Sequence, residues 1–141
     1  YAHTPEALRC VLNSIREIAK EKLITLFGCG GDRDKEKRKS MGELANEFSD
    51  LVIITDDNPR SESPSNIRKD ILKGCPAAKV IPDRNKAINY AISKLQKDDF
   101  LLIAGKGHET SQTIGIETLP FDDYTVAKES IKNISKLRKA D

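Results

Sequence analysis

Two short polar segments carry the residue types best suited to binding a small charged ligand. They are Asp57-Asn58-Pro59-Arg60 and Gly105-Lys106-Gly107-His108-Glu109. In the first segment, the planar guanidinium of Arg60 suits bidentate binding of a carboxylate, and the Asn58 amide can both donate and accept hydrogen bonds. In the second, two glycines permit close approach of a ligand to the backbone, and the Glu109 carboxylate could accept hydrogen bonds from an ammonium. Together the segments favour a ligand that carries both carboxylate and ammonium groups, such as an amino acid.

Each segment also has a simpler, purely structural interpretation. Asp, Asn and Pro are common turn formers, so residues 57–60 could form an ordinary turn that makes no use of Arg60. The two interpretations of this segment are equally compatible with its sequence. His108 could act as a base, but an isolated histidine in a turn more often makes a structural hydrogen bond, so we treat it only as a residue lining the site.

A third segment, Gly28-Cys29-Gly30-Gly31-Asp32-Arg33, contains three glycines after an apolar run. A dinucleotide-binding fingerprint needs a glycine at the position of Arg33, where the following helix packs closely, so the match fails there. The glycines could still expose backbone N–H groups to an anion, with Arg33, Lys35 and Arg38 adding positive charge. Taken alone, the segment is explained slightly better as a glycine turn before a solvated helix. A dinucleotide oxidoreductase with Asp56 on the ribose is a further alternative.

These segments must be positioned by the strands and helices that alternate along the chain. Apolar runs predict strands at residues 23–27, 51–54 and 100–104 and, more weakly, at 79–81. Residues 113–119 alternate enough to form an edge strand or a hairpin. Helices are predicted from Pro5 onward, over 35–48, from 63 to about 73, around 87–95 and over 123–139, with Thr4 and Ser63 as N-caps before prolines. The residues expected to face inward are Leu8, Val11, Leu12, Ile15, Ile18, Met41, Leu44, Ala45, Phe48, Ala87, Ile88, Ala91, Ile92, Leu95, Ala127, Ile131, Ile134 and Leu137.

Strands without polar alternation are typical of a sheet that is covered on both faces. The pattern therefore predicts an α/β fold: a doubly wound, mostly parallel sheet with helices on both faces and an antiparallel edge strand. The 141 residues fit a single domain, 1–141. Loops that follow parallel strands gather along one edge of such a sheet, and this would bring the three polar segments together.

Composition argues against several classes of function. The chain has 24 basic and 22 acidic residues, a net charge of +2 and no extended basic stripe, so a nucleic-acid-binding surface is not indicated. Three cysteines and two histidines lack the spacing of a zinc site, and we expect buried free thiols in a reducing cytosol. No run of about 18 apolar residues predicts a membrane span.

Taken together, four segments resemble the C-terminal domain of the Mur ligases, in particular the branch of that family that uses 2,6-diaminopimelate. In chain order they are Tyr1-Ala2-His3-Thr4-Pro5, Phe27-Gly28-Cys29-Gly30-Gly31-Asp32-Arg33-Asp34-Lys35, residues 57–60 and residues 105–109. The resemblance extends from Tyr1 to about Lys128. Four motifs in the right order and spacing are far more specific than any one of them alone.

The resemblance implies a cytoplasmic, ATP-dependent enzyme of peptidoglycan synthesis. Such a ligase phosphorylates the D-glutamate carboxylate of UDP-N-acetylmuramoyl-L-alanyl-D-glutamate, and the amine of meso-diaminopimelate then attacks the acyl phosphate. The C-terminal domain binds the incoming amino acid. By motif match, its substrate contacts would be Arg33, Asp57, Asn58, Pro59, Arg60, Gly105 and Glu109, and its nucleotide contacts Tyr1, His3 and Lys35.

Within this site the resemblance gives the charged residues separate roles. Arg60 and Asn58 would bind the distal carboxylate of the amino acid, and Glu109 its distal ammonium. Since lysine has no distal carboxylate, Arg60 favours diaminopimelate over lysine as the substrate.

The chain departs from the family pattern in two respects. Glu36 and Lys39 replace smaller or apolar residues, which weakens the expectation of phosphate contacts after Arg33. No Gly-x-x-Gly-Lys-Thr phosphate loop is present, although ATP chemistry of this type needs one. The family carries that loop, the Mg²⁺ ligands and the UDP-sugar site on preceding domains. We therefore expect the C-terminal domain of a longer ligase, inactive alone, with a non-catalytic interaction module as the alternative.

Overall fold

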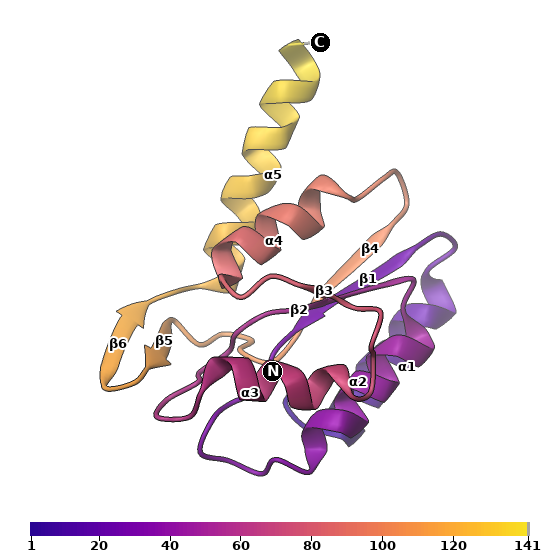
Figure 1. Ribbon diagram of the computed structural model, residues 1–141. Helices are drawn as coiled ribbons and strands as arrows, with labels where there is room; N and C mark the ends of the chain where they lie inside the picture. The colour runs from indigo at the N-terminus through magenta and orange to yellow at the C-terminus, as the bar shows by residue number, and fades with distance from the viewer. Residues whose placement is uncertain (141) are drawn as a thin grey trace.

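The computed structural model describes residues 1–140 and contains a four-stranded sheet flanked by helices (Figure 1). The strand order is β3-β2-β1-β4, and every pairing is parallel. The strands are β1 (Leu23–Phe27), β2 (Leu51–Ile54), β3 (Lys79–Val80) and β4 (Phe100–Ile103). In the central strand β1, Ile24 lies opposite Leu51 on one side and Leu101 on the other. The predicted doubly wound α/β fold is confirmed.

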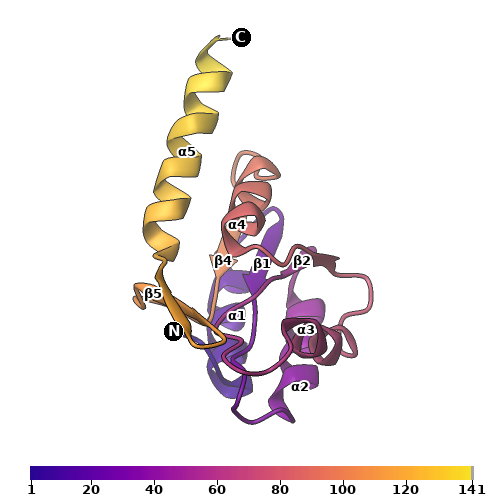
Figure 2. The same cartoon turned by 60° about the vertical axis from the view of Figure 1, so that its left-hand side comes forward.

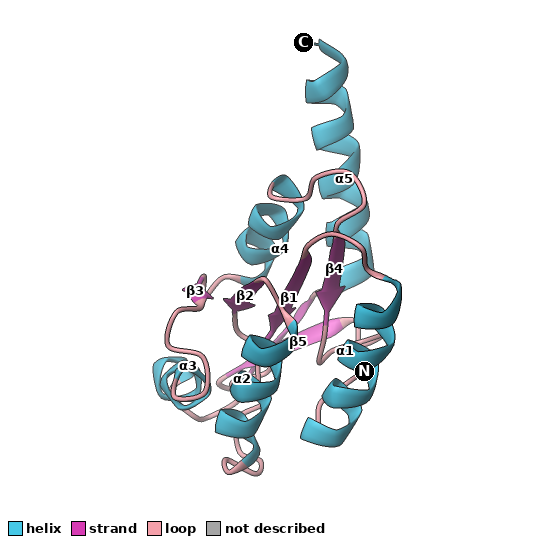
Figure 3. Ribbon diagram, turned by 90° about the vertical axis from the view of Figure 1, so that its right-hand side faces the viewer, coloured by secondary structure: helices cyan, strands magenta, loops and turns pink. Residues whose placement is uncertain are grey.

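Helices cover both faces of this sheet (Figure 3). One face carries α1 (Pro5–Ile18), α2 (Lys37–Phe48) and α3 (Pro64–Leu72), and the other carries α4 (Arg84–Ser93) and α5 (Asp123–Ala140). Side chains of β1 alternate between two cores: Leu23 and Phe27 enter the first, whereas Ile24 and Leu26 enter the second. Because both faces are buried, the strand needs no polar alternation.

Local sequence determines where the helices begin. Thr4 and Ser63 each accept a hydrogen bond from the backbone N–H three residues later, at 3.2 and 3.4 Å, which confirms both predicted N-caps. Helix α2 begins at Lys37, two residues later than predicted. The reason is that the Asp34 side chain accepts a hydrogen bond from the Glu36 N–H (2.9 Å) and holds this stretch in a turn.

The antiparallel strands form a separate hairpin, so the expected edge strand is wrong and the hairpin alternative is correct. β5 (Ser111–Ile114) pairs with β6 (Glu117–Pro120) in a two-stranded sheet that is separate from the four-stranded one. The edge of β5 contacts the loop after β2 instead of the main sheet. The Arg60 N–H donates to the Thr113 carbonyl (3.1 Å), and the Arg60 carbonyl accepts from the Gly115 N–H (2.7 Å). The hairpin is therefore attached to a polar loop that carries predicted site residues.

Parts of two predicted helix faces lie in solvent. Helix α5 extends past the sheet (Figures 1 and 2), and Ile131 and Leu137 are 53% and 68% exposed, contrary to expectation. Ile134 does contact the second core. Ile18, at the end of α1, is also exposed. Periodicity predicts a helix correctly here, but an apolar stripe can be longer than the surface that covers it. No helix of the described part of the chain is both long and apolar enough to cross a membrane.

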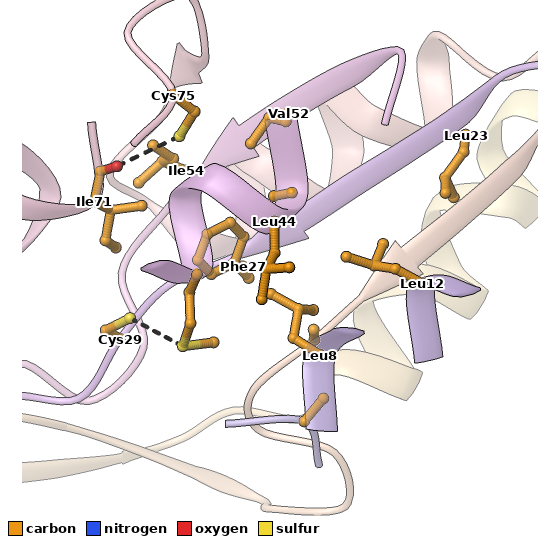
Figure 4. Close-up of a cluster of buried hydrophobic side chains, with 14 of the residues drawn as sticks. Leu8, Leu12, Leu23, Phe27, Cys29, Leu44, Val52, Ile54, Ile71 and Cys75 are labelled. Carbon is orange, nitrogen blue, oxygen red and sulfur yellow. Dashed lines mark hydrogen bonds between the residues drawn. The ribbon is translucent and has the colours of Figure 1, made fainter. Parts of the chain in front are cut away.

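Two of the three cysteines lie in the first core (Figure 4). The Cys29 sulfur lies 3.9 Å from the sulfur of Met41, and the Cys75 thiol donates to the Ile71 carbonyl at 3.5 Å. Cys10 is exposed on α1, so the expectation of buried thiols is wrong for this residue. Cys10 lies on the outer side of the amphipathic helix α1, away from the apolar residues that face the core.

Candidate functional site

The three polar segments meet at the carboxyl ends of β1, β2 and β4. The chain leaves β1 for α2 on one face and reaches β4 from α4 on the opposite face, so a topological switch point lies between β1 and β4. A cavity of about 250 Å³ opens there. It is lined by Tyr1, His3, Gly30, Arg33, Lys37, Asp57, Asn58, Arg60, Gly105 and Glu109.

The cavity wall contains all the predicted substrate and nucleotide contacts except Pro59 and Lys35, and it does not include His108, which was expected to line the site. Pro59 is buried beneath the glycine loop, where its carbonyl oxygen would lie 1.8 Å from a Cβ added at Gly31. Lys35 is largely exposed and pairs with Glu62 at 3.5 Å. The sequence analysis missed Lys37, which lines the cavity and whose ammonium donates to the carbonyl of His3, a second lining residue (2.8 Å).

Arg60 occupies a strained backbone position, with φ +54°. The hydrogen bonds to β5 hold it there, and its Nη1 donates to the carbonyl of Gly31 (2.9 Å). A Cβ added at Gly30 would lie 2.8 Å from the same Nη1, so a larger residue there would have to displace this guanidinium. Within residues 1–140 no carboxylate lies within ion-pairing distance of Arg60. The guanidinium is therefore held in place by hydrogen bonds to backbone carbonyls, without a carboxylate partner among these residues.

The acidic side of the cavity surrounds a fully buried lysine. The Nζ of Lys106 lies 3.1 Å from Asn58 Oδ1, 3.5 Å from Glu109 Oε2 and 3.7 Å from Asp57 Oδ1. Burial raises the pKa of the Asp57 carboxyl, and the positive charges of Arg84 and Lys106 oppose that rise. The sequence analysis gave Lys106 no role, because a lysine between two glycines looks like a solvated loop residue.

Strand β5 donates hydrogen bonds to the 57–60 loop. The Gln112 side-chain amide donates to the Asp57 carbonyl (2.7 Å), and the Thr113 N–H donates to Asn58 Oδ1 (2.9 Å). The hairpin therefore fixes both the backbone of this loop and one of its side chains.

The glycine loop is held by Arg38, which is fully buried and faces inward. Its guanidinium makes two hydrogen bonds of 2.8 Å to the Glu62 carboxylate, a third to Asp70 (3.1 Å) and a fourth to the Gly30 carbonyl (3.1 Å). The hydrogen bonds from Arg38 are the main reason that the pKa of Glu62 is lowered to about 2. The expectation that Arg38 offers positive charge to an anion is wrong, because the side chain is fully buried and its Nη1 and Nη2 donate to groups inside the protein.

Aromatic side chains form the rim of the cavity next to the N-terminus. The Tyr1 ring lies 4.7 Å from the His3 ring and 5.7 Å from the His108 ring, centroid to centroid. A Cβ added at Gly107, which has φ +56°, would lie 2.9 Å from the Cβ of Tyr1. Tyr1 is thus packed against the loop that carries Glu109.

Two further observations concern the alternatives. Asp56, which a dinucleotide site would place on a ribose, is paired with Arg68 at 2.5 Å. Among residues 1–140, no three His, Cys, Asp or Glu side chains are grouped so that they could hold a metal ion.

A family model and similar curated proteins point to the same family. The family model described as Mur ligase, glutamate ligase domain, matches residues 1–107. The UDP-N-acetylmuramoyl-L-alanyl-D-glutamate–2,6-diaminopimelate ligase of Prochlorococcus marinus is 52% identical over 139 residues, covering 96% of the chain and 27% of that protein. The ligase of the same name from Clostridioides difficile is 51% identical over 138 residues, covering 95% and 28%.

Solved structures agree at the level of the fold. A structure of a UDP-N-acetylmuramoyl-L-alanyl-D-glutamate–2,6-diaminopimelate ligase is 39% identical, with a TM-score of 0.89, and the match covers 96% of the chain and 28% of that structure. The bifunctional folylpolyglutamate synthase/dihydrofolate synthase of Yersinia pestis is 18% identical, with a TM-score of 0.60 over 93% of the chain and 27% of that structure, and shares the fold alone. The chain thus spans little more than a quarter of the length of the relatives it matches.

Proposed function

Because the chain belongs to the Mur ligase family, we propose that it is the amino-acid-binding part of a longer, ATP-dependent ligase. The reaction we propose adds meso-2,6-diaminopimelate to UDP-N-acetylmuramoyl-L-alanyl-D-glutamate in the cytoplasm. One observation carries the proposal: the guanidinium of Arg60, which has no carboxylate partner among residues 1–140, and the carboxylate of Glu109 line the same cavity, with Asn58 between them. A ligand end that is itself a zwitterion matches this arrangement.

The two ends of the site would bind opposite charges. Arg60 and Asn58 would donate to the distal carboxylate of the amino acid, and Glu109 would accept from its distal ammonium. Arg33 is exposed at the cavity mouth, with its guanidinium on the Asp32 carbonyl (2.9 Å), and would extend the cationic side. Asp57, Pro59 and Gly105 would shape the pocket through the backbone and the packing of its wall.

The chemical step would combine this site with the preceding domains. ATP would phosphorylate the D-glutamate carboxylate, and the amine held by this chain would displace phosphate to form an amide. Tyr1 and His3 at the cavity rim, and the exposed Lys35, would approach the nucleotide when the domains close. Mg²⁺, bound by the preceding domains, would neutralise phosphate charge.

Substitution of Arg60 in the full-length protein tests this proposal. For Arg60→Ala we expect kcat/KM for diaminopimelate to fall roughly 30-fold or more, since a buried charge-assisted contact is worth about 2–5 kcal/mol. Addition of lysine should change far less, because lysine has no carboxylate for Arg60 to bind. Arg9→Ala, on the exposed side of α1, is the matched control.

Two results would contradict the proposal. If Arg60→Ala preserved the preference for diaminopimelate over lysine, the role assigned to Arg60 would be wrong. If the full-length wild-type protein ligated no amino acid in the presence of ATP, the non-catalytic module would be the better description.

A further inference from the structure

The side-chain amide of Asn58 lies at the junction of the cationic and anionic sides of the cavity. An asparagine amide has one accepting and one donating end, and rotation by half a turn exchanges them. Which end faces the cavity decides whether Asn58 can bind a carboxylate or an ammonium. The surroundings of Asn58 therefore bear directly on substrate choice.

Two groups that can only donate contact one end of this amide. They are the ammonium of Lys106, 3.1 Å from Oδ1, and the backbone N–H of Thr113, 2.9 Å from Oδ1. Neither can accept a hydrogen bond, so the atom that faces them must be the oxygen. A flipped amide would place its NH₂ group against these two donors, and both hydrogen bonds to this end of the amide would be lost.

The opposite end of the amide is consequently a donor. Its Nδ2 donates to Glu109 Oε2 at 3.2 Å, and its second hydrogen has no acceptor among residues 1–140. Asn58 lines the cavity, whereas Lys106 is fully buried behind it. Lys106 therefore reaches a ligand only through the residues that it orients.

We propose that Lys106 is a positioning residue, which fixes the Asn58 amide with its NH₂ group toward the ligand and so favours amino acids with a distal carboxylate. This inference rests on the proposed function. Thr113 N alone would hold the oxygen with a single hydrogen bond. The buried ammonium adds a charge-assisted bond and excludes the flipped orientation.

A double-mutant cycle in the full-length ligase tests the inference. The variants are Lys106→Met, Asn58→Ala and the double variant, each assayed with diaminopimelate and with lysine. For Lys106→Met we expect kcat/KM for diaminopimelate relative to lysine to fall about 10- to 100-fold, the range for one hydrogen bond to a charged group. If Lys106 acts through Asn58, the double variant should discriminate no worse than Asn58→Ala. Lys97→Met, at an exposed lysine, is the control.

Several results would overturn the inference. Additive losses of discrimination in the cycle would mean that Lys106 acts independently of Asn58. Equal losses for both amino acids, or none beyond the Lys97→Met control, would reduce Lys106 to a structural or general electrostatic role. Wild-type ligation and the effect of Arg60→Ala are measured in the same series, so failure of the proposed function is recognised separately.

A second variant tests the amide orientation even if Lys106→Met does not fold. In Asn58→Asp, one carboxylate oxygen can keep the bonds to Lys106 and Thr113 N, and the other replaces the NH₂ group. We expect discrimination to be lost as fully as in Asn58→Ala. Retained discrimination would mean that the amide oxygen faces the ligand, and the inference would fail.

Discussion

At the scale of single residues, the site depends on buried cations that bind no ligand themselves. Arg38 holds the glycine loop, and Lys106 lies behind the cavity wall. Arg84 is also buried and donates to Asp123 and to the carbonyls at the ends of β2 and β4, Asp56 and Ala104. Each cation donates hydrogen bonds to several loop groups that would otherwise bind water, and these bonds hold the loops in place.

Loss of the Glu62 carboxylate should show the cost of removing the main partner of such a cation. We expect Glu62→Gln to lower the free energy of unfolding at pH 7 by roughly 3 kcal/mol, because the fully buried Arg38 loses its main partner. Urea unfolding measures this change. Glu47→Gln, at an exposed position of α2, should stay within about 0.5 kcal/mol of the parent.

The same pair predicts an acid dependence. The pKa of Glu62 is lowered from 4.5 to about 2 in the folded chain, so its contribution to stability is present above about pH 4.5 and is lost as pH falls toward 2. Stability curves of the parent and of Glu62→Gln should therefore converge across this window. Parallel curves down to pH 2 would show that the carboxylate is not selectively stabilised in its charged form.

At the scale of elements, the predictions succeeded where one local pattern decides the structure. Short apolar runs such as 51–54 are typical of strands that are covered on both faces, and Thr4 before Pro5 supplies the side-chain oxygen of an N-cap. The convergence of the three loops followed from the parallel topology. The inward turn of Arg38 could not be predicted, because in a run of mixed charges it looks like its solvated neighbours. Its acidic partners, Glu62 and Asp70, come from distant sequence.

Helix faces illustrate the same limit, since periodicity does not reveal what covers a face. We expect Leu12→Ala in α1, which is fully buried, to cost about 2–5 kcal/mol of unfolding free energy. Leu137→Ala in α5 should change it by less than about 0.5 kcal/mol, because that side chain is 68% exposed. Chemical denaturation of both variants makes the comparison, and similar losses would mean that the end of α5 is covered in solution.

At the scale of the whole molecule, the two cores on either side of the sheet link the site to global stability. The loops that line the cavity are the continuations of β1, β2 and β4, which both cores bury. Hydrogen bonds from the hairpin and from buried cations then connect these loops to one another. Opening the first core should therefore also release the cavity wall, as a cooperative event.

The cysteines can report that event. We expect one thiol, Cys10, to react with iodoacetamide in the native chain, and Cys29 and Cys75 to react only when the chain unfolds, because they lie in the first core. Burial raises the pKa of Cys29 to about 12 and that of Cys75 to about 11, from 9.0. The folded state therefore keeps both thiols protonated. The stability that this provides is present below about pH 9 and declines as pH rises toward the folded values.

Mass spectrometry after alkylation in increasing urea should show both core thiols becoming reactive together, at the midpoint measured by circular dichroism. Labelling of Cys29 well before that midpoint would instead show that the glycine loop opens on its own.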